Sequence, residues 1–147
     1  MSWIRIWIHF VFTTKNRVGY LSSAGIRRTL FDHIKQNSSK KEIWIDSIGG
    51  SKEHIHCLVS LGKEQTISKI AQLIKGESSF WINNNNISEL KFGWQDDYWA
   101  VSVSESQIPE VRRYILNQEN HHEIRTFEEE YNDFIKKYGW DKINSDK

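Results

Sequence analysis

The sequence predicts an α+β fold in which an antiparallel sheet is covered by helices on one face. Three observations point to it: strict alternation of apolar residues in the first dozen positions, apolar residues at helical spacing in two later segments, and further alternating segments between and after them. The 147 residues suit one domain, and the 38% that are apolar are enough for a single packed core. We therefore expect residues 1–147 to form one domain.

The first dozen residues, MSWIRIWIHFVF, predict a strand rather than a membrane segment. Ile6 and Ile8 alternate with Trp7 and His9, which is the period of a strand with one buried face. Polar residues interrupt the apolar run, and it is far shorter than the ~20 residues that a membrane helix needs. The single cysteine, Cys57, excludes an internal disulfide. We expect a cytoplasmic protein that has no membrane partner.

The next segments predict a helix and a hairpin. Apolar residues at helical spacing indicate a helix over 23–38, with Ser22 or Ser23 as its N-cap. Residues 41–50 are typical of a second strand, and the two glycines that close it lead into a third strand at 51–61 as a hairpin.

A second helix and a fourth strand complete the pattern. The helix begins near Thr66, where apolar residues again recur at helical spacing, and residues 96–106 alternate as a strand. The resulting order β-α-β-β-α-β is that of a ferredoxin-like unit, an antiparallel sheet with both helices on one face. The other face of the sheet is then left for a ligand, another subunit or the C-terminal helices.

The third strand, SKEHIHCLVSL, places two histidines on one face. Because side chains alternate along a strand, His54 and His56 point the same way, whereas Ile55 and Cys57 point to the opposite face, into the core. The two histidine backbones are roughly 7 Å apart, so both rings can reach one ion or one phosphate. This face of the strand is a candidate metal site.

From Pro109 onward the chain predicts two helices. They break near Arg125 and Thr126, and Thr126 with Glu129 can form a capping box at the start of the second. We expect residues 140–147 to be a disordered tail.

The first C-terminal helix carries a polar stripe. At about 100° per residue, Tyr114, Gln118, His121 and His122 share one arc of the helix. A histidine at a helix end commonly contacts the terminal carbonyl groups, and we assign that role to His121 and His122. Tyr114 and Gln118, one turn apart, remain as the candidates for chemistry.

A tyrosine nucleophile needs help at neutral pH. With a pKa near 10, only about a thousandth of the phenol is ionised, so it requires a base, a cation or a polarised electrophile. A divalent ion held by His54, His56 and Gln118 would keep positions open for phosphate oxygens, and Tyr114 would stand next to that ion. These four residues are therefore the candidates for a metal site with a tyrosine beside it.

With these motifs in this order, the chain resembles the small single-tyrosine HUH transposases of bacterial insertion sequences, the IS200-like type, and their REP-associated tyrosine transposase relatives. The resemblance rests on EHIHCLVSL for the His-hydrophobic-His pair, ISKIAQLIKGESSFWI for the central helix, and YILNQ for the tyrosine and glutamine. It extends from HFVFTTKNR to NQENHHEIRTFEEEY, most of the chain. Glu53 stands where relatives often have aspartate, which leaves the ligands intact.

The resemblance implies a DNA transposase that acts as a single-strand DNA endonuclease and ligase. Tyr114 would attack a DNA phosphate, form a 5′-phosphotyrosine link and free a 3′-hydroxyl for rejoining. The implied cofactor is Mg²⁺ or Mn²⁺ on His54, His56 and Gln118, with no small-molecule cofactor. The implied partners are single-stranded DNA with hairpin ends and a second copy of the chain, in a homodimer whose tyrosine helix can serve the partner's histidines.

Cationic side chains supply the salt-dependent part of DNA affinity, although most such residues on any protein are merely solvated. The chain carries a net charge of only +1, so a DNA surface must be local. Candidate DNA contacts lie in the loop after the first strand, on the central helix, and beside the tyrosine: Lys15, Arg17, Lys75, Gly76, Ser78, Ser79, Arg112 and Arg113.

Two other functions remain open from the sequence. One is a domesticated REP-type or hairpin DNA-binding protein that keeps the scaffold without transposition. The other is a metal-dependent phosphoesterase in which the histidine pair activates water and Tyr114 is structural. The sequence leaves His9 as a structural residue, and it leaves open the DNA target, the physiological metal and whether Tyr114 acts in its own chain or in a partner.

Overall fold

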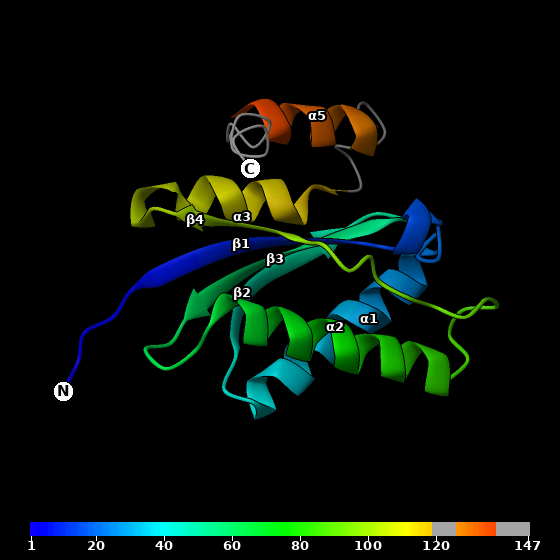
Figure 1. Ribbon diagram of the computed structural model, residues 1–147, viewed down its shortest axis with the longest axis horizontal. Coiled ribbons are helices and arrows are strands. Elements are labelled where there is room, and N and C mark those ends of the chain that lie inside the picture. The colour runs from blue at the N-terminus through cyan, green and yellow to red at the C-terminus, as the bar shows by residue number, and fades with distance from the viewer. Residues whose placement is uncertain (119–125, 138–147) are drawn as a thin grey trace.

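The computed structural model describes residues 1–118 and 126–137, and its centre is one four-stranded antiparallel sheet (Figure 1). The strand order β2-β3-β1-β4 is that of the predicted ferredoxin-like unit, with the first and third strands in the middle. The strands are β1 (Ile6–Thr13), β2 (Trp44–Gly50), β3 (His54–Leu61) and β4 (Trp99–Val103).

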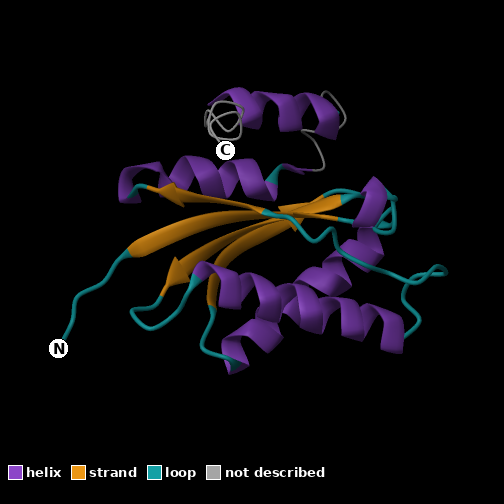
Figure 2. Cartoon of the chain, in the orientation of Figure 1, coloured by secondary structure: helices purple, strands orange, loops and turns teal. Residues whose placement is uncertain are grey.

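Helices cover both faces of this sheet (Figure 2). On one face lie α1 (Ala24–Lys40) and α2 (Ile67–Asn84), the two helices of the ferredoxin-like unit. On the other face lie α3 (Ile108–Leu116) and, above it, α5 (Phe127–Lys137). The α+β class and the C-terminal helices that the sequence predicts are confirmed. Two short 3₁₀ turns, Lys15–Arg17 and Glu105–Gln107, follow β1 and β4.

The helix starts follow from side-chain caps. The Ser23 hydroxyl accepts a hydrogen bond from the backbone N–H of Ile26, so Ser23 rather than Ser22 is the cap of α1. Thr66 caps α2 in the same way by accepting from the N–H of Lys69 at 3.2 Å.

The C-terminal helix α5 also begins at a predicted cap. The N–H of Glu129 donates to the Thr126 hydroxyl at 3.2 Å, and that hydroxyl lies 3.2 Å from the Glu129 carboxylate. The predicted break at Arg125 and the predicted tail at 140–147 lie outside the described residues.

The main core lies between the sheet and α1 and α2. It contains alternate residues of the two central strands, among them Phe10 and Phe12 of β1 and Ile55 of β3, all nearly inaccessible to solvent. The alternation predicted for β1 continues too far toward the N-terminus, because the strand begins only at Ile6 and the chain before it leaves the sheet (Figure 1). Ile6, which the alternation assigns to the buried face, is exposed at the start of the strand, as is Ile4 before it.

A second, smaller apolar cluster holds α3 against the opposite face. It consists of Trp7 and Leu58 from the sheet with Ile108 and Ile115 from α3. Gly49 of β2 permits this close packing, because a Cβ at that position would overlap the carbonyl oxygen of Ile115. The position of α3, and with it that of Tyr114 and Gln118, is therefore set by contact with the sheet. In the part of the chain that the structure describes, no helix has the length and apolar character needed to cross a bilayer.

Candidate active site

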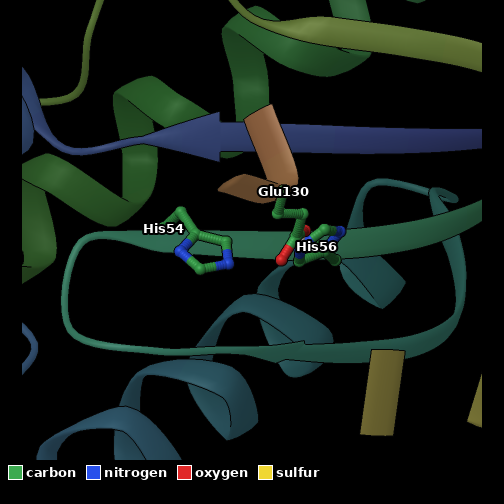
Figure 3. A group of neighbouring side chains, drawn as sticks. All are labelled: His54, His56 and Glu130. Atoms are coloured by element: carbon green, nitrogen blue, oxygen red, sulfur yellow. Dashed lines mark ion pairs between the residues drawn. The ribbon is translucent and has the colours of Figure 1, made fainter. Parts of the chain in front are cut away.

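The two histidines of β3 lie on the sheet face that α3 and α5 cover. His54 and His56 are both fully buried, and their rings are 5.0 Å apart between centroids. Neither ring belongs to the main apolar core, which takes Ile55 and Cys57 from the opposite face of the same strand. The alternation predicted for this strand thus delivers both imidazoles to one place (Figure 3).

Tyr114 of α3 and Gln118, two residues beyond the end of that helix, lie at this histidine pair. The helix that the sequence predicts from Pro109 thus ends at Leu116, before Gln118. The side-chain oxygen of Gln118 lies 3.1 Å from Nε2 of His54, and the Gln118 amide group donates to the backbone carbonyl of Tyr114 at 3.2 Å. That second bond fixes the amide orientation, so the oxygen is the atom that faces His54. The Tyr114 ring, half-buried, meets the His56 ring edge to face at 5.5 Å between centroids. Tyrosine, glutamine and both histidines of one chain therefore converge.

Helix α5 adds two residues that the sequence reasoning missed. Glu130 is buried, and its carboxylate lies 3.1 Å from Nε2 of His56. Phe127 stacks on the His54 ring with centroids 4.2 Å apart. The sequence did contain a signal for Glu130. Glu130 and Tyr131 follow Phe127 by three and four residues and so share its helical face, and a carboxylate on an otherwise apolar face is unusual.

The donor atoms of these residues lie close enough together to be candidate ligands of a divalent cation. His54, His56 and Glu130 each offer one ligand atom, and these atoms all lie within 4.8 Å of one another. Two ligands at right angles on one octahedral ion, each about 2.1 Å from it, are about 3.0 Å apart. The His54–Gln118 and His56–Glu130 separations are both 3.1 Å. Two imidazole nitrogens with an amide and a carboxylate oxygen thus fit an ion such as Mg²⁺ or Mn²⁺.

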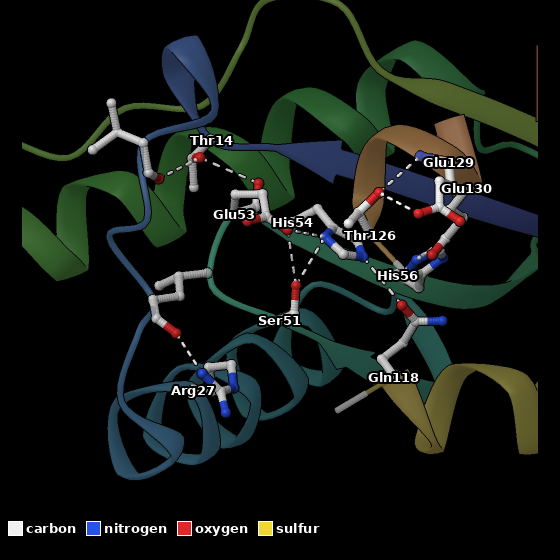
Figure 4. A network of polar contacts seen from close by, with 12 residues as sticks. Thr14, Arg27, Ser51, Glu53, His54, His56, Gln118, Thr126, Glu129 and Glu130 are labelled. Carbon is white, nitrogen blue, oxygen red and sulfur yellow. Dashed lines mark hydrogen bonds and ion pairs between the residues drawn. The ribbon is translucent and has the colours of Figure 1, made fainter. Parts of the chain in front are cut away.

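Polar groups contact the Nδ1 side of the His54 ring, away from Gln118 (Figure 4). Its Nδ1 lies 3.2 Å from the Glu53 carboxylate and 3.1 Å from the Ser51 hydroxyl. Burial by itself raises the pKa of Glu53, but the hydrogen bonds from His54 and Ser51 and the nearby positive charge outweigh it and bring that pKa below its usual value. An ionised carboxylate only accepts hydrogen bonds, so Nδ1 of His54 carries a proton and donates it to Glu53. The other ring nitrogen, Nε2, is the one that faces Gln118.

Another histidine contacts the Nδ1 side of the His56 ring. Nε2 of His9, on β1, lies 2.8 Å from Nδ1 of His56, and the two residues are buried on adjacent strands. Burial, together with the neighbouring His56, lowers the pKa of His9 to about 3. His9 is therefore neutral at physiological pH.

The predicted DNA contacts fall on opposite sides of the sheet. Lys75, Gly76 and Ser79 are on α2, whereas Arg112 and Arg113 are on α3 beside Tyr114. Lys15 and Arg17 are exposed in the turn after β1, and the Arg17 guanidinium lies over the rings of Phe127 and Tyr131.

Several of these residues already have partners. Arg112 forms two hydrogen bonds to Asp46 at 2.8 and 2.9 Å, and Lys75 donates to the carbonyl of Asp96. The Ser78 hydroxyl is fully buried and bonds to the Ile74 carbonyl and to a tryptophan N–H. Ser78 therefore presents no surface to DNA, which corrects its place among the expected contacts. His121 and His122 lie outside the described residues.

The same fold occurs in solved transposases. A structure from Deinococcus radiodurans R1, described as a candidate transposase, has a TM-score of 0.63 at 18% identity and covers 80% of this chain and 93% of its own. A REP-associated tyrosine transposase, solved bound to a REP hairpin, has a TM-score of 0.54 at 19% identity and covers 78% of this chain and 67% of its own.

The family assignment rests on sequence. The model of the family described as "Transposase IS200 like" matches residues 2–118, so the chain belongs to the IS200-like transposase family. No match was found among curated proteins. The predicted family is confirmed, and the roles of the individual residues remain predictions.

Proposed function

We propose that this transposase cleaves and rejoins a single DNA strand with Tyr114 as the nucleophile. The observation that carries the proposal is the convergence within one chain of Tyr114 on His56 and of Gln118 on His54, from α3 and the residues just after it onto one strand. Family membership supports the reaction class, because the family is one of transposases. The phenol oxygen bonds to phosphorus, the bond from phosphorus to the 3′ oxygen breaks, and the phenol proton leaves to solvent as the 3′ oxygen becomes a hydroxyl.

We assign the divalent ion to His54, His56, Gln118 and Glu130. Mg²⁺ or Mn²⁺ held there would polarise a phosphate oxygen and offset the charge that develops in the transition state. The residues themselves do the positioning, since the amide of Gln118 is fixed by the backbone of Tyr114 and the nucleophile and ligand therefore move together with α3.

A groove offers DNA a route to the site. It is lined by Arg27 and Arg28 of α1, by Gly49 of β2, and by Gln118. A strand lying in it would have two guanidinium groups beside its phosphates, which supports binding of a polyanion. Lys15, Arg17, Arg112 and Arg113 are further proposed contacts near the covered face. Lys75, Gly76 and Ser79 on α2 are proposed for a DNA hairpin of the kind bound by the REP-associated relative.

The proposed site is complete in one chain, so we propose that Tyr114 acts with its own histidines. A homodimer remains a proposal, and a mixing experiment tests the delivery of the tyrosine. Tyr114→Phe and His56→Ala variants, each inactive, should stay inactive when mixed. Recovery of cleavage in the mixture would mean that the tyrosine serves the partner's ion.

The direct test is adduct formation on a single-stranded oligonucleotide that carries a hairpin, with Mn²⁺ present. The wild-type chain should give a covalent protein–DNA band that depends on the metal, and Tyr114→Phe should abolish it. Tyr131→Phe is the matched control, because Tyr131 is a neighbouring tyrosine that packs on Trp99 of β4. This variant should still form the covalent adduct. An adduct that survives Tyr114→Phe would refute the proposal, and product without any adduct would favour a water-using phosphoesterase.

One observation favours a second candidate, a hairpin-binding protein without turnover. His54 and His56 have no solvent-exposed surface, because α5 places Phe127 and Glu130 on them. In that case hairpin DNA would bind, and no divalent ion would elicit cleavage.

A further inference from the structure

We propose that a cavity beside the candidate active site binds one unpaired base of the DNA strand and selects guanine. The inference rests on the proposed function and deepens it, because it names a base that the strand must carry near the cleaved phosphate. The cavity has a volume of about 460 Å³, within the usual range for a ligand site, and it lies where β1 ends and β4 begins. The residues of its wall that carry the argument are Asn16, Arg17, Gln95, Asp97 and Trp99.

One aromatic ring separates this cavity from the histidine pair. Phe127 stacks on the His54 ring, and its own ring centroid is 6.3 Å from that of Trp99 in the cavity wall. Thr13, another residue of the wall, pairs with His54 in the register of β1 and β3. A strand whose phosphate lies at the histidines can therefore place a neighbouring base in the cavity.

Trp99 gives the cavity an aromatic wall, and Arg17 gives it a positive charge. Trp99 is half-buried, and the guanidinium of the exposed Arg17 lies 5.3 Å from the centroid of the Phe127 ring. Proteins that bind single-stranded nucleic acid combine basic groups along the backbone with aromatic rings on which the bases stack, and such stacking tolerates every base. Stacking therefore accounts for the binding of a base, and the polar groups of the wall must decide which one.

The backbone of the wall is strained beside the cavity. Among the described residues other than glycine, four have a positive φ, and two of these, Glu42 and Asn86, directly follow the C-caps of α1 and α2, where this conformation is ordinary. The other two, Asn16 at 58° and Arg17 at 54°, are adjacent and lie in the cavity wall. Such residues persist only where the surrounding structure holds them, and they cluster at ligand sites. The strain thus supports a site that the fold has built.

Gln95 and Asp97 fix the hydrogen-bond pattern of the cavity. The side-chain oxygen of Gln95 accepts from the backbone N–H of Asn16 at 3.1 Å, and the backbone N–H of Gln95 donates to the Thr13 carbonyl at 2.8 Å. The amide nitrogen of Gln95, which only donates, is then the group that can bind a carbonyl oxygen of a ligand. The Asp97 carboxylate only accepts, so it requires N–H groups.

Guanine is the base that suits one donor beside one carboxylate. Its Watson–Crick edge carries a carbonyl oxygen followed by two adjacent N–H donors, on N1 and on the 2-amino group. Gln95 would donate to the carbonyl oxygen, and the two oxygens of Asp97 would accept from the two N–H donors. Adenine and cytosine offer a single amino group on this edge, and thymine offers a single N–H between two carbonyls. Each of these bases would leave one oxygen of Asp97 without a donor from the base.

The test is fluorescence anisotropy with short single-stranded oligothymidylates that carry one central guanine, hypoxanthine, adenine or cytosine, with EDTA present so that no strand is cleaved. A good bidentate contact discriminates between bases by about 5- to 150-fold, so the guanine strand should bind at least about fivefold more tightly than the all-thymine strand. Hypoxanthine lacks only the 2-amino group of guanine, and it should lose most of this gain. Equal affinity for the guanine and thymine strands, or tighter binding of adenine or cytosine, would overturn the inference.

A matched pair of variants tests the role of the carboxylate. Asp97→Asn should abolish the preference for guanine over hypoxanthine, because an amide presents one oxygen and one NH₂ group in place of two oxygens. Asp96→Asn is the control, because it removes the same charge from an exposed neighbour outside the cavity wall and should keep the preference. An unchanged preference in Asp97→Asn would refute the assignment.

NMR of the tryptophan side chains tests where the base binds. The indole N–H signal of Trp99 should shift on addition of the guanine strand, whereas that of the exposed Trp44, on the edge strand β2, should not. A shift at Trp44 with none at Trp99 would place the base elsewhere and overturn the inference.

These outcomes also separate the inference from the proposed function. Adduct formation at Tyr114 without any preference for guanine would defeat only the inference. A preference for guanine that depends on Asp97, in a chain that forms no adduct, would defeat the cleavage reaction and leave the base site standing. Binding of none of the strands would overturn the inference together with the single-strand binding on which it rests.

Discussion

Replacing Gly49 by alanine should slow strand cleavage strongly, although the added methyl group would not touch Tyr114, Gln118 or the histidines. A Cβ on Gly49 would overlap the carbonyl oxygen of Ile115 and lie 3.0 Å from its carbonyl carbon. Both atoms are α3 backbone, so the helix itself must retreat. Tyr114, one residue before this contact, and Gln118, three residues after it and just beyond the helix, would then be displaced. Relief of the overlap needs a shift on the order of 1 Å, and a misplacement of that size can cost about 10²-fold in rate.

The assay is the initial rate of adduct formation on a hairpin oligonucleotide with Mn²⁺, together with urea unfolding. We expect Gly49→Ala to lose about 10²-fold in rate and about 1–3 kcal/mol in the free energy of unfolding, the usual range for overpacking. Gly25→Ala is the matched control, because its Cβ would meet only the Ser23 hydroxyl at an ordinary 3.5 Å. A folded Gly49→Ala chain that cleaves at the wild-type rate would refute the reasoning, since the site would then tolerate a displaced α3.

Three further predictions concern the surroundings of the site. Phe127→Ala removes the buried ring that stacks on His54, and such a change typically destabilises a packed element by about 3–5 kcal/mol. Hydrogen exchange should therefore accelerate in residues 127–137 and not in the sheet, and unchanged exchange would contradict this. Hydrogen bonds from Arg112 hold the pKa of Asp46 below its usual value. The pair therefore stabilises the fold fully at a pH above the usual pKa of an aspartate, and this stabilisation is lost as the pH falls through the lowered pKa of Asp46. The unfolding free energies of wild type and Arg112→Ala should therefore converge on acidification, and a constant gap would count against the pair. Burial raises the pKa of the Cys57 thiol to about 12, so a thiol reagent at pH 8 should label it only after denaturation, and rapid labelling of the folded chain would be the opposing result.

Local periodicity explains why much of the fold and four residues of the candidate site could be predicted. Alternation along β3 requires His54 and His56 to share a face, and helical spacing requires Tyr114 and Gln118 to share one. The β-α-β-β-α-β order then requires the strand and the helix to meet on the face that α1 and α2 leave uncovered.

The remaining site residues come from tertiary packing that periodicity does not encode. The sequence shows that α5 is amphipathic, but not that its apolar face covers the histidine pair, so Glu130 and Phe127 escaped notice. His9 was placed on the correct face, but its contact with His56 depends on the register between β1 and β3. The burial of Ser78 does follow from periodicity, because Ser78 lies four residues after Ile74 on the stripe of α2 that faces the core.

The residue that carries the covalent bond to DNA identifies the nucleophile. Trypsin cuts after Arg113 and Arg125, so Tyr114 is the only tyrosine of the peptide 114–125, and mass spectrometry of a nuclease-trimmed adduct can locate the nucleotide. We expect a nucleotide phosphate on the Tyr114 oxygen, formed only with a divalent ion and lost in His56→Ala. A nucleotide on any other residue, or cleaved DNA with no modified peptide, would contradict it.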